Sequence, residues 1–132
     1  MIYQYNKLVR DKIPSQINAI EGRKATWRTL KDDEYVAELD KKLLEESHEF
    51  IEAHSVEELG DLMEVIEAIM EFHKIQKNEV MEKQGLKRNK KGGFRDKVYL
   101  EYVEENERNM REEKEYGVLG IKIKLDTEEL RN

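Results

Sequence analysis

The sequence predicts an all-α protein built around an antiparallel pair of helices, with a short irregular or β-like tail at the C-terminus. Helix-breaking residues are rare, with one proline and seven glycines, and helix-forming Glu, Lys and Leu dominate. Apolar residues recur at helical spacing in two consecutive segments. A serine capping signal lies between these segments and leaves room only for a tight turn, so the two helices should run antiparallel.

Composition and charge limit the functions open to the chain. Its 132 residues suffice for one domain with a modest core. The lack of cysteine excludes disulfides, zinc–thiolate sites and thiol nucleophiles. With 30 acidic and 24 basic residues the net charge is −6, which disfavours binding to nucleic-acid polymers. No apolar run suits a signal peptide or a membrane span, so we expect a soluble cytoplasmic protein.

The first helix is expected to be short. Pro14 suits the first turn of a helix, because its missing N–H would have no helical partner there. The helix should continue to about Ile20, and Gly22 would then stop it.

Two long helices are expected next. Asp32 or Asp33 can cap the first of them, which should run to about His54, and acidic residues in its first turn favour the helix dipole. Residues 55–58, Ser-Val-Glu-Glu, form a capping box that begins the second long helix. This helix is expected to reach about Lys83.

The remainder of the chain gives weaker signals. Residues 86–97 contain six basic residues and one acidic residue, and Gly92-Gly93 breaks any helix, so we expect a basic, flexible loop. Residues 98–102 alternate weakly as in a strand, residues 104–116 resemble a polar helix, and residues 121–125 alternate again.

Acidic side chains fall on the apolar faces of both long helices. On a helical wheel, Glu46 lies within the apolar half of the first long helix and Glu49 lies at its rim. Glu58 and Asp61 lie within the apolar arc of the second. A carboxylate in an apolar interface is costly unless it is neutralised, paired or bound to a cation. The tight turn should bring these four acids together near the connection.

Few basic residues are available to neutralise the acids, because residues 33–82 contain 16 acidic and four basic residues. An all-oxygen ligand set favours Mg²⁺ or Mn²⁺ over zinc, and Mg²⁺ commonly engages phosphates, which indicates a nucleotide substrate. Simpler alternatives stay open. Glu58 can complete the capping box, Asp61 can interact only with the helix dipole, and Glu-rich helices are most often solvated surfaces.

These residues also resemble a known family pattern. Glu45–Glu49 is similar to the E-E-x-x-E element of the all-α MazG-like nucleoside triphosphate pyrophosphohydrolases, and Glu58–Asp61 resembles their E-x-x-D element. Asn6–Pro14 and Gly92–Phe94 resemble flanking features of a small single-domain branch that is labelled phosphoribosyl-ATP pyrophosphohydrolase-like. The two carboxylate elements on consecutive helices, with both flanks in order, make the resemblance specific.

The resemblance implies an activity and a site. The family cleaves the α–β bond of a nucleotide and releases a monophosphate and pyrophosphate. The extent of the resemblance implies that residues 1–105 form a MazG-like domain and that residues 106–132 form an extension packed on or beside it. Glu45 or Glu49 would orient the attacking water as a general base. The implied ligands of Mg²⁺, with Mn²⁺ as a substitute, are Glu46, Glu49, Glu58 and Asp61.

Basic residues on both flanks are the expected partners of the substrate phosphates. Lys42, at the rim beside Glu49, forms either a salt bridge or a phosphate contact. The basic run at residues 86–97 is equally compatible with a solvated tract. The other candidate phosphate-binding residues are Lys7, Arg10, Lys12, Lys87, Lys91 and Arg95.

The sequence also predicts a homo-oligomer and leaves one competing function open. Family members form dimers or tetramers, and the apolar arc of the second long helix is wider than one neighbouring helix covers, so we expect a homodimer or homotetramer. The competing hypothesis is a non-catalytic helical dimerisation or adaptor module whose basic loop contacts an anionic partner. A metal enzyme is stabilised by Mg²⁺ and an adaptor of this kind is not.

Overall fold

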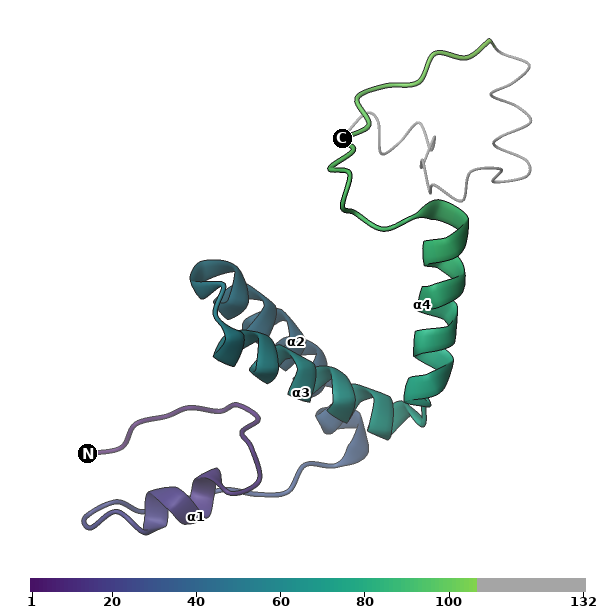
Figure 1. Ribbon diagram of the computed structural model, residues 1–132. Helices are drawn as coiled ribbons and strands as arrows, with labels where there is room; N and C mark the ends of the chain where they lie inside the picture. The colour runs from purple at the N-terminus through teal and green to yellow at the C-terminus, as the bar shows by residue number, and fades with distance from the viewer. Residues whose placement is uncertain (107–132) are drawn as a thin grey trace. The chain divides into compact units, whose positions relative to one another are not determined.

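The computed structural model of the protein describes residues 1–106. In this part of the chain the regular secondary structure is entirely helical, which confirms the all-α class there. The chain divides into two units after Lys91, and all the helices of the described part belong to the first unit. The helices are α1 (Ile13–Asn18), α2 (Asp32–Ala53), α3 (Val56–His73) and α4 (Lys77–Lys91) (Figure 1).

Helices α2 and α3 pack against each other as an antiparallel hairpin (Figure 1). The connection consists of His54 and Ser55. His54 adopts a left-handed conformation with φ of 51°, and its N–H donates to the Phe50 carbonyl, which ends α2. Ser55 begins α3, because its Oγ accepts a hydrogen bond from the Glu58 N–H at 3.2 Å. The predicted tight turn and serine cap are therefore confirmed.

The hairpin has a small apolar core. Among the described residues, Leu39 on α2 and Val65 on α3 are its buried apolar side chains. Farther from the turn, the Tyr35 ring meets the Phe72 ring edge-on, with centroids 5.4 Å apart. Burial raises the pKa of the Tyr35 hydroxyl, and the nearby Glu71 carboxylate adds to the effect. So small a core leaves much apolar surface of the two helices exposed.

The start of α2 differs from the sequence prediction. Lys31, and neither Asp32 nor Asp33, is the N-cap residue. The two aspartates lie in the first turn, where the helix dipole favours them. Glu34 takes the capping role, because its carboxylate accepts from the Lys31 N–H at 3.3 Å and pairs with both terminal nitrogens of Arg28, at 3.0 and 2.8 Å. This bidentate pair lowers the pKa of Glu34.

The prediction that α3 continues to about Lys83 is wrong. The helix ends at His73, and Lys74 adopts a left-handed conformation with φ of 57°. The Lys74 N–H donates to the Glu71 carbonyl and the Ile75 N–H to the Met70 carbonyl at 2.9 Å, which is a regular way to end a helix. No glycine or proline marks this position in the sequence, so the stop could not be seen there.

The basic region and the first strand-like region also differ from expectation. Residues 86–91 form the last turns of α4, and only from Gly92, with φ of +86°, does the chain leave the helix. Residues 98–102 form no strand, because no other segment of the described chain pairs with them. Residues 104–106 are not helical. The rest of the predicted polar helix, the strand-like region at 121–125 and nearly all of the predicted extension lie outside the described residues.

The predicted short helix near the N-terminus is present as α1. Pro14 lies in its first turn as expected, and Gly22 adopts φ of +81° in the turn that follows. The Asn18 side chain accepts a hydrogen bond from the Ala25 N–H at 2.8 Å and closes this turn. None of the helices in residues 1–106 is both long and apolar enough to cross a bilayer.

Candidate functional site

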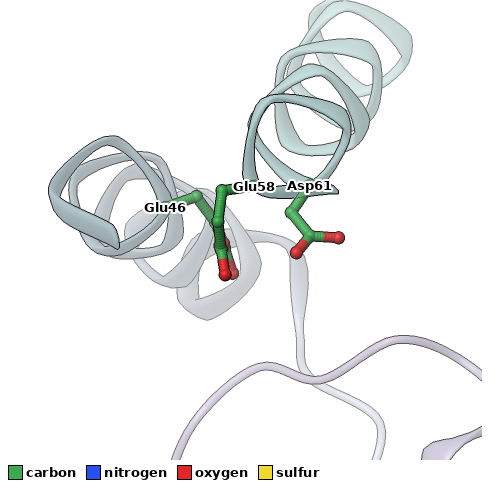
Figure 2. Close-up of side chains that lie close together, drawn as sticks. All are labelled: Glu46, Glu58 and Asp61. Atoms are coloured by element: carbon green, nitrogen blue, oxygen red, sulfur yellow. The ribbon is translucent and has the colours of Figure 1, made fainter. Parts of the chain in front are cut away.

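Three carboxylates converge beside the turn of the hairpin. Glu46, from the C-terminal half of α2, and Glu58 and Asp61, from the N-terminal half of α3, each offer one oxygen, and these oxygens lie within 4.8 Å of one another. Figure 2 shows the three side chains extending to the same side of the two helices. The antiparallel hairpin thus joins side chains from two separate sequence elements.

The cluster contains buried oxygens without partners. Glu46 is only 7% exposed and is the one buried charged residue in the described part of the chain. Glu46 Oε2 and Glu58 Oε2 are both inaccessible to solvent and accept no hydrogen bond there. A buried acceptor without a partner destabilises a fold, and a buried carboxylate does so more strongly than a neutral group. Such oxygens are suited to a cation.

The structure bears on the two simpler alternatives for the acids of α3. Ser55 caps the helix, but the Glu58 carboxylate does not return a contact to the Ser55 N–H in the described structure, so the reciprocal capping box is absent. Asp61 lies one turn beyond the acidic residues of the first turn, where the helix dipole has largely faded. Neither alternative therefore accounts for the position of these side chains.

Burial and neighbouring negative charge both disfavour the ionised carboxylates of the cluster. Burial is the first cause that raises the pKa of Glu46, followed by the neighbouring Glu49 carboxylate, and Lys42 opposes the shift. Burial likewise raises the pKa of Glu58, together with the charges of Glu49 and Asp61. The Glu49 carboxylate therefore lies close enough to act on both Glu46 and Glu58. The site favours a proton or a cation over its own bare charge.

Lys42 borders the cluster on α2. Its ammonium Nζ lies 3.5 Å from Glu46 Oε1 and 3.4 Å from Glu45 Oε1, so Lys42 forms salt bridges with both acids. Lys7 also lies 3.4 Å from the same Glu45 oxygen. Partial burial works against the charge of Glu45, but Lys42 and Lys7 outweigh it and lower the pKa of Glu45. Glu45 is thus held as an ion-paired carboxylate beside the cluster.

Arg10 provides the shortest ion pair of the region. Its Nη2 lies 2.7 Å from Oδ1 of Asp61, one of the three clustered acids. The sequence predicts Arg10 and Lys7 as phosphate ligands, and the structure places both against acidic side chains of the hairpin. The pairing of Arg10 with Asp61 was missed, because 51 residues separate the two and no spacing pattern connects them.

The other predicted phosphate ligands belong to different parts of the chain. Lys12 is the N-cap residue of α1. Lys87 and Lys91 lie in the C-terminal half of α4, which follows the C-terminal end of α3, whereas the cluster adjoins the N-terminal end of α3. Arg95 belongs to the second unit of the chain. The structure thus brings two of the predicted flanking bases, Lys7 and Arg10, to the acidic residues of the hairpin.

Comparisons with known proteins give little further information. No family model matches the chain, and no solved structure matches it. A stretch of 40 residues is 60% identical to an uncharacterized protein of Mycolicibacterium smegmatis. The match covers 30% of this chain and only 40% of the length of that protein, whose description assigns no activity. The geometry of the site is therefore the basis for inferring a function.

Proposed function

We propose that the chain is a cytoplasmic, Mg²⁺-dependent nucleotide pyrophosphohydrolase of the MazG-like type. It would cleave the α–β bond of a nucleoside triphosphate or related nucleotide to a monophosphate and pyrophosphate. The observation that carries the proposal is the pair of buried, unpartnered oxygens, Glu46 Oε2 and Glu58 Oε2, within a three-carboxylate cluster. The similarity of the E-E-x-x-E and E-x-x-D elements to those of the family supports it.

The donor set fits a hard divalent cation. Carboxylate oxygens are preferred ligands of Mg²⁺ and Mn²⁺, and two oxygens on opposite sides of Mg²⁺ would be about 4 Å apart. The candidate oxygens of Glu46, Glu58 and Asp61 lie within 4.8 Å, so a small side-chain adjustment suffices. Glu49 would be a fourth ligand, because its charge already acts on Glu46 and Glu58.

Side chains of the protein would bind the phosphates and act as the general base. A bound Mg²⁺ would neutralise phosphate charge and lower the pKa of a bound water. Lys7 and Arg10 would bind the phosphates, the guanidinium through paired N–H donors. Glu49 is the better general base, because the ion pairs with Lys42 and Lys7 lower the pKa of Glu45 and make Glu45 a weaker base. A general base at Glu49 would lie next to the clustered acids.

The proposal includes a homo-oligomer. Apolar side chains follow one face of α3 and remain exposed: Val56 is 89%, Leu59 44%, Met63 52% and Ile66 41% exposed. Their spacing of three or four residues forms a continuous stripe. Contiguous exposed apolar surface commonly marks an interface, so a second copy of the chain would cover this stripe as a dimer or tetramer.

The decisive assay measures pyrophosphate release by the purified protein with Mg²⁺. The substrate panel comprises canonical, deoxy, damaged and phosphoribosyl nucleotides. We expect release from at least one substrate, its loss on Glu46→Gln, and its retention on Glu64→Gln, because Glu64 is an exposed acid of α3. No release from any substrate, without stabilisation by Mg²⁺, would favour the adaptor hypothesis instead.

A further inference from the structure

The side chain of Arg10 contacts one of the three clustered acids. Its guanidinium lies 2.7 Å from Asp61, and it adds one positive charge to a cluster of three carboxylates in which Glu46 is paired with Lys42. The pair is not buried, since the Arg10 side chain is 58% exposed and that of Asp61 is 41% exposed. An exposed ion pair is weak and exchanges its partner readily.

The N-terminal segment, residues 1–12, reaches the hairpin through two such pairs. Lys7 contacts Glu45 at 3.4 Å and Arg10 contacts Asp61 at 2.7 Å. The segment precedes α1, contains no helix, and its first six residues are exposed. Both of its cationic contacts are with acids, and both cations are side-chain types that bind phosphate equally well. The segment is therefore held by contacts that a phosphate can replace.

We propose that Arg10 is a built-in competitor for the divalent cation: it neutralises Asp61 in the metal-free protein and transfers to a substrate phosphate when metal and nucleotide bind. This inference rests on the proposed function, because it concerns the same site. Repulsion between a guanidinium and a divalent cation favours the exchange, and a phosphate offers the guanidinium a more highly charged partner. Metal and nucleotide then promote each other's binding, since each favours the state in which Arg10 has left Asp61.

If Arg10 instead supports the metal site, its loss changes the metal affinity in the opposite direction. Asp61 has two carboxylate oxygens, and Arg10 contacts Oδ1. If Arg10 stays in place and orients Asp61 while a metal binds the other oxygen, it is a supporting partner of the site. Loss of such a partner weakens metal binding. Loss of a competitor strengthens it, so the direction of the change decides between the two roles.

Calorimetric titration of the full chain with Mn²⁺ alone, without nucleotide, measures this direction. We expect Arg10→Gln to bind Mn²⁺ about two- to fivefold more tightly than the wild type, the range that corresponds to an exposed ion pair. Lys7→Gln is the matched control for general loss of positive charge, because Lys7 contacts Glu45 outside the three-carboxylate cluster. Its effect should be clearly smaller.

Hydrogen exchange of residues 1–12, measured by mass spectrometry, provides a second readout. We expect faster exchange when Mg²⁺ is added to the wild type, and no response to Mg²⁺ in Arg10→Gln. Wild-type binding of Mn²⁺ that Arg10→Gln leaves unchanged or weakens would overturn the exchange role alone. A wild-type chain that binds no Mn²⁺ would overturn both this inference and the proposed function.

Discussion

The Glu46 carboxylate on α2 and the Glu58 carboxylate on α3 converge across the hairpin, and each has a buried oxygen without a hydrogen-bond partner. Within residues 1–106, Lys42 and Arg10 partly relieve the repulsion in the metal-free fold. A site that is destabilised without its ligand is stabilised most when the ligand binds.

Mg²⁺ should raise the thermal stability of the protein. A ligand that binds only the folded state stabilises it by about 2.7 kcal/mol when its concentration is 100 times the dissociation constant. Differential scanning calorimetry with and without Mg²⁺ measures the shift in melting temperature. Glu46→Gln should lose the response, whereas Glu64→Gln should keep it. An equal response in both variants would place the binding of Mg²⁺ elsewhere.

Glu58→Gln should stabilise the metal-free protein and abolish metal binding. The substitution removes a charge that burial, Glu49 and Asp61 all disfavour, while it keeps the size of the side chain. Chemical denaturation without divalent cations gives the free energies of unfolding, with Glu64→Gln as the exposed control. A destabilised Glu58→Gln that still binds metal would instead support a capping role for Glu58.

The metal-free protein should gain stability as the pH falls from 7 to about 5. The pKa values of Glu46 and Glu58 are raised in the folded state, so the folded protein binds more protons in the range above their ordinary value of 4.5. Glu34 and Glu45 act in the opposite direction. Because their pKa values are lowered, their stabilisation is lost only as the pH falls below that value.

Denaturation at pH 7 and at pH 5 tests whether the metal-free protein becomes more stable as the pH falls. The double variant Glu46→Gln, Glu58→Gln should lack the gain of the wild type between these two pH values. Saturating Mg²⁺ should reverse the trend, because protons then compete with the cation for the same oxygens. A wild type and a double variant with the same pH dependence would show that the two carboxylates are not strained.

Met63→Lys should dissociate the homo-oligomer. The substitution places a charge in the exposed apolar stripe of α3, where a second copy would have to bury it. Analytical ultracentrifugation gives the mass of the wild type, of Met63→Lys and of the control Glu64→Lys, which places a lysine at the adjacent exposed position outside the stripe. A wild-type monomer, or a Met63→Lys variant of unchanged mass, would contradict an interface on this face.

The hairpin was predictable because its signals are local. Apolar periodicity identifies α2, and the serine cap at Ser55 fixes both the start of α3 and the tightness of the turn. Once the turn is fixed, the helical wheel alone brings Glu46, Glu58 and Asp61 together. Residues on opposite sides of a short connection can be paired from spacing.

The differences arose where a contact outweighs a residue preference. The Arg28–Glu34 pair moves the start of α2 away from a conventional aspartate cap, and Lys74 ends α3 without a glycine. Arg10 reaches Asp61 through an irregular segment whose course no periodic pattern describes. The basic residues of α4 remain helical because Lys and Arg are good helix formers, so positive charge alone does not indicate a loop.

The central claim is tested most directly by phosphorus NMR of a reaction that contains the protein, Mg²⁺ and the nucleotide that responds best in the panel. We predict equal amounts of nucleoside monophosphate and pyrophosphate, with neither product formed by Glu46→Gln. Nucleoside diphosphate and orthophosphate as the products, or the same products from Glu46→Gln, would contradict a pyrophosphohydrolase site built on Glu46, Glu58 and Asp61.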